Sequence, residues 1–367
     1  PEAGGSEVHA ARIAERWAAA GIDVVLSVSR APGAPRAGDA GGYRVVRRAG
    51  RYMVFPASVA GGVARRVGRR PGRPDGVVEI WNGMPFASPL WAPHPRVVFL
   101  HHVHGGMWDL VLPPALAHLG KFVERRVAPP LYRGTPVVTL SESSKRQIVG
   151  ALGFDASRVT VVPPGVDSRF RPGGRKEAAP LVVAVGRLVP YKRFDLLIDV
   201  LARLRWRHPR MRAVIAGEGS ERPALEAVAA HHHAGGWMTL PGRIGDDDLA
   251  DLYRRAWLVM STSGYEGWGM TITEAAACGT PAVASPIAGH TDAIVDGATG
   301  VLAEPGAAMV EAADALLRDE VLRRRLAANA ARRAACLSWD RAAAETLRVL
   351  ARDTASVRRL HGGATRG

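Results

Sequence analysis

Short apolar runs alternate with helical patterns along the whole chain. In the first half, apolar runs bounded by turn residues occupy positions 23–28, 77–81, 97–100, 136–140 and 159–162. Residues 141–153, SESSKRQIVGALG, follow one of these runs and have helical spacing, with Ser141 or Ser143 as the N-cap. Strands that alternate with helices predict an α/β protein with parallel sheets.

The alternation is interrupted at residues 170–180, FRPGGRKEAAP, where Pro, Gly and charge predict an interdomain linker. Beyond it the strand patterns LVVAVG, MRAVIAG, WMTL, WLVMS, PAVAS and VLAEP are again separated by helical patterns. Continuous apolar strands of this kind belong to parallel sheets that are covered on both faces. The sequence therefore predicts two doubly wound, Rossmann-like domains that face each other across a cleft, where a ligand would bind.

The predicted domains cover residues 1–172 and residues 173–338. The segment after them begins with a Ser cap and carries Trp339 with apolar positions on one helical face, so it predicts a helix over 339–353 in which Trp339 is largely buried. Residues 354–367, rich in Arg and Gly, are predicted to form a loosely held tail. The chain opens on a glycine turn that leads into a helix, so we expect the first strand of the N-terminal domain to be missing.

The composition of the chain argues against several classes of protein. The chain has 367 residues, 47% of them hydrophobic, and no run of 18 apolar residues, so it contains ample core and no membrane-spanning pattern. Two cysteines are too few for a disulfide framework, which favours the cytoplasm. The net charge of +15 points to an anionic partner, or else to a compositional bias towards Arg. Aromatic residues make up only 6% and do not interleave with basic clusters, so no nucleic-acid partner is expected.

The motif GRLVPYKR directly follows the first strand of the second domain. Arg187 and Lys192 therefore emerge at the carboxyl edge of that sheet, on a loop that leads into a helix. Two cations at this spacing can hold a diphosphate from two directions, the guanidinium as a fork and the ammonium as a point charge. The alternative is a solvated basic loop.

The stretch YEGWGMTITEA contains two carboxylates and two glycines. Gly267 and Gly269 allow the backbone to approach a ligand, and the helix that starts near Met270 presents free N–H groups to a phosphate. Glu266 lies before the helix and Glu274 about one turn inside it, so we interpret them as ligands of a sugar and of a ribose. The alternative is one capping glutamate and one solvated glutamate.

The motifs GGSE, HHVH, SESS, VVPPGVD, GRLVPYKRFDLLI, AGEG, PGRIGDDDLADLYRRA and EGWGMTITEAAACGTPAVAS follow one another in this order. In this order the chain resembles the retaining family 4 glycosyltransferases of GT-B fold, from Gly4 to about Asp353. The resemblance implies a hexosyltransferase that moves a sugar from a nucleoside-diphosphate donor to an acceptor hydroxyl with retained anomeric configuration. It implies same-face attack in which the leaving phosphate accepts the proton, with no metal and no other cofactor.

The resemblance also implies roles for individual residues. Arg187 and Lys192 would stabilise the leaving diphosphate, Glu266 would bind the sugar hydroxyls and Glu274 the donor ribose. The remaining donor contacts would come from Gly4, Gly5, Arg243, Ile244, Gly267, Trp268, Gly269, Met270 and Thr271. Among these, Gly4 and Gly5 would form a loop towards the diphosphate, and Arg243 and Ile244 would cradle the base. Trp268 departs from the commoner Phe, and the terminal helix is expected to cross back onto the first domain.

The HHVH motif places three imidazoles after a strand. Adjacent side chains on an extended segment point to opposite faces, so at most His102 and His104 could share a metal, and no carboxylate lies at useful spacing. A packed histidine cluster is one interpretation, and contact with the donor sugar is the other. The resemblance favours His101 as the active-site histidine. Residues 246–248, three aspartates, are interpreted as a helix N-terminus rather than as metal ligands.

The sequence leaves alternative functions and several partners open. Another GT-B activity, such as a phosphorylase or a sugar-nucleotide epimerase, would share the phosphate-binding loops, and a non-enzymatic polyanion-binding protein would account for the charge. The expected donors are GDP-mannose, UDP-glucose or UDP-N-acetylglucosamine, and the acceptor is a small or lipid-linked molecule. A lipid-linked acceptor would bring peripheral contact with the inner face of the membrane.

Overall fold

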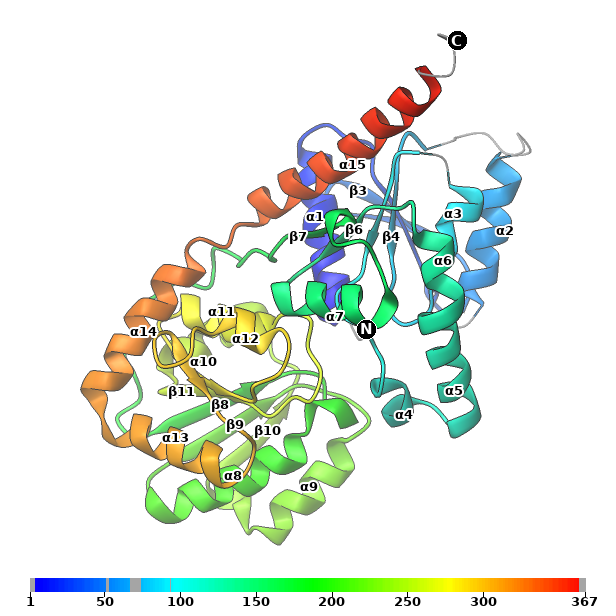
Figure 1. Cartoon of the computed structure of the whole chain (residues 1–367). Coiled ribbons are helices and arrows are strands. Elements are labelled where there is room, and N and C mark those ends of the chain that lie inside the picture. Colours follow the sequence, from blue (N-terminus) through cyan, green and yellow to red (C-terminus); the bar gives the residue numbers. More distant parts are fainter. Residues whose placement is uncertain (1–3, 51–52, 67–73, 93, 363–367) are drawn as a thin grey trace. The chain divides into compact units, whose positions relative to one another are not determined.

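The computed structural model describes residues 4–50, 53–66, 74–92 and 94–362, and for residues 65–66 and 355–362 it describes the backbone alone. The chain divides into two compact units, one of residues 1–165 with 339–367 and one of residues 166–338. Each unit has its own parallel sheet and its own core (Figure 1). The predicted α/β class with parallel sheets is confirmed.

The first unit is built on a four-stranded parallel sheet of order β4-β5-β6-β7. Its strands are β4 (Val77–Ile80), β5 (Arg96–Phe99), β6 (Val137–Thr139) and β7 (Val159–Val161). All four coincide with apolar runs of the sequence, and Val98 and Val137 are fully buried. The parallel order brings the loops that follow these strands to one edge of the sheet.

A second, three-stranded sheet of order β1-β3-β2 also belongs to the first unit. It contains β1 (Val25–Val28), β2 (Ala37–Ala40) and β3 (Tyr43–Arg47), with β1 parallel and β2 antiparallel to β3. The sequence pattern predicted β1 but neither β2 nor β3. The reason is that β2 reads AGDA and is mostly exposed, so no apolar run marks it.

Helices cover these sheets. Those of the first unit are α1 (Gly5–Ala19), α2 (Val54–Arg66), α3 (Ser88–Trp91), α4 (Met107–Val111), α5 (Pro114–Phe122), the π-helix η1 (Val123–Val127), α6 (Ala128–Tyr132), α7 (Glu142–Leu152), the 3-10 turn η2 (Ala156–Arg158) and α15 (Trp339–Gly362). Ser141 is the N-cap of α7, since its hydroxyl accepts from the Ser144 N–H at 3.1 Å.

The terminal helix α15 packs against α1 within the first unit. Trp339 is 3% exposed, as predicted, and the Trp17 indole N–H donates to the Ala343 carbonyl at 3.0 Å. The helix does not end at Asp353, where the sequence placed its end, but continues to Gly362. Residues 363–367 of the predicted loose tail lie outside the described residues.

The second unit has a six-stranded parallel sheet of order β10-β9-β8-β11-β12-β13. Its strands are β8 (Leu181–Val185), β9 (Arg212–Ala216), β10 (Met238–Gly242), β11 (Leu258–Ser261), β12 (Ala282–Ala284) and β13 (Gly300–Leu302). Numbered within the unit, this is the order 3-2-1-4-5-6 of a doubly wound sheet. The order reverses between β8 and β11, which places the topological switch point there.

Alternate residues of β8 enter different cores. Val182 and Ala184 join the core with Leu197 of α8, whereas Leu181 and Val183 join the core with Ala275 of α11. Both faces are therefore covered, as the continuous apolar strands predicted. The helices are α8 (Phe194–Arg207), α9 (Arg222–His231), α10 (Asp246–Arg255), α11 (Met270–Ala277), α12 (His290–Ala293), α13 (Ala307–Arg318) and α14 (Glu320–Ala334), with short 3-10 turns η3 (Pro190–Lys192) and η4 (Ala234–Gly236).

The segment predicted as a linker, residues 170–180, belongs to the second unit. Phe170 is 8% exposed and packs with Tyr253 in one of that unit's cores, with ring centroids 5.9 Å apart. The Arg254 guanidinium also donates to the carbonyls of Arg169 and Arg171, at 2.6 and 3.1 Å. The unit therefore begins at Val166, before the predicted boundary at residue 172, because a buried aromatic residue anchors this stretch.

Candidate active site

Three neighbouring strands of the second unit supply the loops of the candidate site. β8, β11 and β12 lie side by side and parallel, so the loops that follow them meet at the carboxyl edge of the sheet. The loop after β8 carries Arg187 and Lys192, the loop after β11 carries Glu266, and the loop after β12 leads to His290. The switch point between β8 and β11 lies among them.

Lys192 and Glu266 form an ion pair across the switch point. The Lys192 ammonium contacts Glu266 Oε1, and the two side chains are 16% and 17% exposed. The Ser263 hydroxyl donates to the same oxygen at 3.1 Å. Burial alone would raise the pKa of Glu266, but the charge of Lys192 and these hydrogen bonds outweigh it and lower the pKa. Glu266 is therefore held as a carboxylate at neutral pH.

His290 completes this cluster, and the sequence analysis missed it. The ring is fully buried at the start of α12, with Nδ1 2.9 Å from the Ser285 carbonyl and Nε2 3.4 Å from Ser261 Oγ. Burial lowers the pKa of His290, although the nearby Glu266 carboxylate opposes the shift. No motif of the sequence marks His290, since it stands alone at the end of the segment PIAGH that follows the strand PAVAS.

The loop that carries Arg187 rests on the backbone of the AGEG motif. A Cβ on Gly217 would lie 1.8 Å from the Gly186 carbonyl oxygen, and one on Gly219 would lie 2.2 Å from the Leu188 carbonyl oxygen. Only glycine permits this backbone contact. The Arg187 side chain is exposed, and its guanidinium donates to the Tyr191 hydroxyl at 2.7 Å.

The N-terminus of α11 lies directly after Glu266. The helix begins at Met270, as predicted, with Gly269 as a left-handed N-cap at φ 101°. Gly267, Trp268 and Gly269 are buried. A Cβ on Gly289 would lie 2.7 Å from the Trp268 backbone nitrogen, so the loop before α12 packs tightly beneath this turn. Met270 and Thr271, both half-buried, form the first turn of the helix.

The other predicted donor ligands of the second unit lie farther along the edge. Glu274 is half-buried on α11 and accepts from the Tyr253 hydroxyl at 3.5 Å. Arg243 and Ile244 follow β10, the strand at the edge of the sheet, and Ile244 packs partly against a core. The structure therefore brings Lys192 and Glu266 together, and it places Glu274, Arg243 and Ile244 on neighbouring elements.

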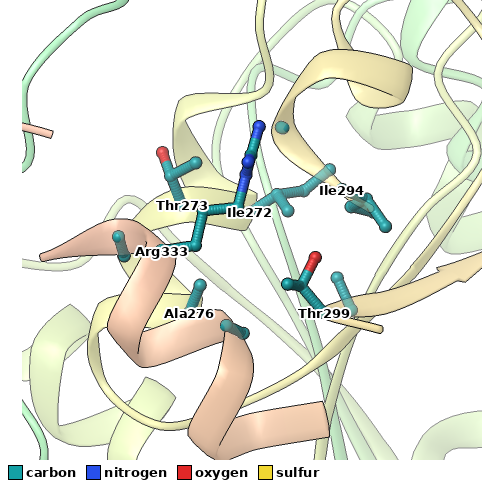
Figure 2. A pocket seen from close by; sticks show the side chains of 10 residues that line it. Ile272, Thr273, Ala276, Ile294, Thr299 and Arg333 are labelled. Atoms are coloured by element: carbon teal, nitrogen blue, oxygen red, sulfur yellow. The ribbon is translucent and has the colours of Figure 1, made fainter. Parts of the chain in front are cut away.

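A small cavity lies behind α11, between α11, α12 and α14. Its volume is about 10 Å³, which is room for at most one water molecule. Figure 2 shows Arg333 of α14 reaching past Ile272 and Thr273, and its guanidinium donates to the Asp292 carbonyl at 2.7 Å. These contacts connect α12, which carries His290, to the helices beneath it, so the cavity is part of the support of the site.

His101, the predicted active-site histidine of the first unit, lies in an uncharged cluster of histidines. His101 follows β5, is 5% exposed, and lies with Nε2 3.2 Å from His9 Nδ1 of α1. Burial lowers the pKa of His9 to about 4 and that of His101 well below its ordinary value. The rings of His102 and His104 stack on each other at 4.7 Å, away from His101, as the alternation along an extended segment predicted.

A buried carboxylate anchors this histidine loop. Glu124 of η1 is fully buried and accepts from the backbone N–H groups of His104 and Gly105, at 2.7 and 3.0 Å. It also accepts from the Trp108 indole N–H at 3.1 Å. No motif marks Glu124 in the sequence, because its partners are backbone N–H groups and an indole of a segment that precedes it in the chain.

The glycine motif at the start of the first unit caps α1. Gly4 is the N-cap of the helix and Gly5 its first residue, and Glu7 Oε2 accepts from the Gly4 N–H at 2.9 Å. The backbone N–H of Gly4 at this helix N-terminus is therefore already hydrogen-bonded to the Glu7 carboxylate.

The described part of the chain contains neither a metal-binding cluster nor a membrane-spanning helix. Within it no group of three or more His, Cys, Asp or Glu side chains is arranged to hold a metal ion. Residues 246–248 form the first turn of α10, as predicted, and Arg169 pairs with Asp246 at 3.2 Å. No helix of the described residues has the length and apolar character needed to cross a bilayer.

Comparison with protein families gives two matches that together span nearly the whole chain. Residues 3–170 match the model of Glycosyltransferase Family 4, and residues 166–333 match the model of Glycosyl transferases group 1. A D-inositol 3-phosphate glycosyltransferase from Streptomyces bingchenggensis is 30% identical over 98% of this chain and 87% of its own length. One of that name from Nocardia farcinica is 36% identical over 55% of this chain, and the match spans about half of that relative, 49%.

Solved structures share the fold at low sequence identity. A sucrose-phosphate synthase from Thermosynechococcus elongatus superposes with a TM-score of 0.82 at 20% identity, over 96% of this chain and 94% of that one. HepE from Anabaena, solved with UDP and glucose, superposes with a TM-score of 0.72 at 19% identity, over 95% of this chain and 96% of its own. At such identities the likeness concerns the fold.

Proposed function

Because the chain belongs to glycosyltransferase family 4, we propose that it transfers a sugar from a nucleoside-diphosphate donor to an acceptor hydroxyl. The observation that carries this proposal is the Lys192–Glu266 pair at the switch point of the second unit, directly before the N-terminus of α11. A half-buried cation, a carboxylate held ionised and free helix N–H groups lie together there. Such a set suits a ligand that has both phosphate and sugar hydroxyls.

Each charged group has a defined role in this proposal. An ammonium carries three N–H donors, so Lys192 can hold Glu266 and still donate to a phosphate oxygen. Arg187, exposed on the same loop, approaches the diphosphate with its fork. The carboxylate of Glu266 accepts hydrogen bonds from sugar hydroxyls, and Glu274 from those of the ribose.

The chemical step is departure of the nucleoside diphosphate. Negative charge develops on the leaving phosphate while the anomeric carbon becomes oxocarbenium-like, and Arg187, Lys192 and the N-terminus of α11 stabilise that charge. The acceptor hydroxyl attacks the same face and transfers its proton to the leaving phosphate, so the configuration is retained. No metal is required, because the two cations neutralise the diphosphate.

The comparisons guide the choice of substrates. Since relatives are named D-inositol 3-phosphate glycosyltransferases, a cyclitol phosphate is the first acceptor to test, followed by lipid-linked alcohols. The net charge of +15 suits an anionic acceptor. The donors to compare are UDP-glucose, UDP-N-acetylglucosamine and GDP-mannose, and a complex of HepE with UDP and glucose puts the uridine donors first.

The deciding experiment incubates the protein with each donor, with and without D-inositol 3-phosphate, and measures release of nucleoside diphosphate. We expect one base to be preferred, both in turnover and in the rise of melting temperature caused by the free diphosphate. Proton NMR of the product should show the anomeric configuration of the donor. If no donor is consumed and UDP, GDP and inorganic polyphosphate raise the melting temperature alike, the chain is a polyanion-binding protein and the proposal fails.

A further inference from the structure

Exposed apolar side chains gather on one segment of the first unit. Between α4 and η1, six large hydrophobic residues are each 44–58% exposed: Leu110, Val111, Leu116, Leu119, Phe122 and Val127. Single exposed residues of this kind are ordinary on protein surfaces, whereas a group on consecutive helices is not. We call residues 107–133 the helical arm. Figure 1 shows α5 and α6 in line along this arm, with α4 turned back at its end.

The apolar residues line the outer face of the arm. Leu116, Leu119 and Phe122 are spaced i, i+3 and i+6 on α5, which keeps them on one side of this helix. The opposite side is buried, because a Cβ on Gly120 would lie 2.8 Å from the Trp108 ring and Glu124 is fully enclosed. Thus the arm is anchored by its inner face, and Leu119 and Phe122 remain 55% and 58% exposed on the outer side.

Basic side chains accompany the apolar face. A hollow of about 450 Å³ lies beside η1 and α6, and four arginines line it: Arg125, Arg126, Arg133 and Arg158. Asp155, the carboxylate in its lining, is engaged by the Ser157 N–H and hydroxyl, each at 2.8 Å. The hollow therefore carries a net positive charge next to an exposed apolar stripe.

We propose that the helical arm docks this protein on an anionic lipid membrane. The apolar stripe enters the interface between headgroups and acyl chains, and the four arginines bind headgroup phosphates. A second copy of the chain fits this surface less well, because a two-fold contact would bring the same arginines against each other. The proposal does not depend on sugar transfer, since vesicle binding is measured without any donor.

The test is co-sedimentation of the full chain with vesicles of phosphatidylcholine, with and without phosphatidylglycerol. We expect at least about tenfold more bound protein with phosphatidylglycerol, and a steep fall as salt is raised. The double variants Leu119→Ser with Phe122→Ser and Arg125→Glu with Arg126→Glu should each lower binding about tenfold. All four side chains are exposed, so the melting temperature should stay near that of the parent.

Matched control variants make the same apolar and charge substitutions on the surface of the second unit. Trp206→Ser with Val321→Ser removes two apolar side chains that are 88% and 80% exposed in the second unit, and Arg203→Glu with Arg210→Glu makes the same charge change. Both controls should bind vesicles like the parent.

Several outcomes would overturn the proposal. One is equal binding of the parent protein to vesicles with and without phosphatidylglycerol. Another is that the control variants lose as much binding as the arm variants do. If only the arginine variant weakens binding, the hollow is a simple anion site and the arm does not insert. If sedimentation velocity reveals a dimer that the Leu119 and Phe122 variant dissociates, the arm is a self-association surface.

Discussion

The loops that follow β5 and β8 occupy equivalent places, each after a central strand of a parallel sheet, but they are electrostatic opposites. After β5, His101 and His9 are buried against each other, and burial lowers the pKa of each ring. Beyond β8, Lys192 meets Glu266, and a carboxylate that burial would neutralise stays ionised. Burial alone favours the neutral form of an ionisable side chain, but an oppositely charged partner can restore the charged form.

The two units therefore differ in the charge of their buried polar side chains. The second unit holds charged side chains where a charged ligand is expected to bind. The first unit keeps His9 and His101 neutral, and its buried carboxylate Glu124 holds the loop backbone and the Trp108 indole. Substitutions in the first cluster should therefore change stability and pH response, whereas those in the second should change turnover.

The largest expected effect is that of Lys192→Ala. Removal of the ammonium takes away stabilisation of the leaving diphosphate and leaves Glu266 without its counter-charge, so turnover should fall by about two orders of magnitude or more. The measurement is the initial rate of nucleoside-diphosphate release at saturating donor. Lys145→Ala, on α7 of the first unit, is the control and should keep the parent rate. Near-native turnover in the Lys192 variant would remove the phosphate-binding assignment.

The next effect in size concerns the anchor of the histidine loop. In Glu124→Gln an amide NH₂ replaces one oxygen that accepts from N–H groups, so the free energy of unfolding should fall by about 3 kcal/mol. Urea unfolding followed by tryptophan fluorescence measures it. Glu226→Gln, in an exposed pair with Arg222, should change the same quantity by less than about 0.5 kcal/mol. Equal values for the two variants would contradict the anchoring role.

A smaller effect is a pH dependence of stability that comes from His9. Its pKa is about 4 in the folded protein against 6.5 in the unfolded chain, so between these values the unfolded chain binds more protons. Stability is therefore complete above pH 6.5 and is lost as the pH falls towards 4. The loss should reach about 2 kcal/mol at pH 5.

The variant His9→Phe tests this dependence, because it keeps a ring between Phe99 and Trp339 without a titrating group. Its free energy of unfolding should fall less than that of the parent between pH 7 and pH 5. The exposed residue His118 offers the control His118→Phe, which should retain the parent slope. Parallel curves for the parent and the His9 variant would show that burial of this ring does not govern the acid response.

The smallest expected effect is that of metal removal. If Arg187, Lys192 and the N-terminus of α11 neutralise the diphosphate, EDTA should leave the rate of donor consumption unchanged. The measurement compares rates with EDTA and with added Mg²⁺ or Mn²⁺. A strict requirement for either ion would bring His102, His104 or residues 246–248 back as ligands.

Much of the fold could be predicted from the sequence because the relevant signals are local. All six strands of the second unit and the four of the parallel sheet in the first were marked by apolar runs between turn residues. β2 was missed because an exposed strand needs no apolar run, and β3 was missed because its sequence YRVVR has only a short apolar stretch between arginines. The boundary near residue 172 was misplaced because the burial of Phe170 against Tyr253 joins residues far apart in the chain.

The candidate site was predictable only in part, for a similar reason. Arg187, Lys192, Glu266 and Glu274 stand in motifs whose glycines and position after a strand can be read directly. His290 and Glu124 have no such motif, and their importance appears only from what surrounds them. A sequence shows where a loop begins, but not which carbonyl or N–H it will meet.

By itself the sequence determined the alternation of strands and helices, the loops that carry the charged motifs, and the family to which they belong. The period of apolar side chains, the positions of glycines and the positions of charges are local features, so they can be read from the sequence alone. Tertiary structure alone decided that Lys192 meets Glu266, 74 residues later, and that His290 joins them. The physical reason is the strand order, which places β8, β11 and β12 side by side and so makes partners of loops that are distant in the chain.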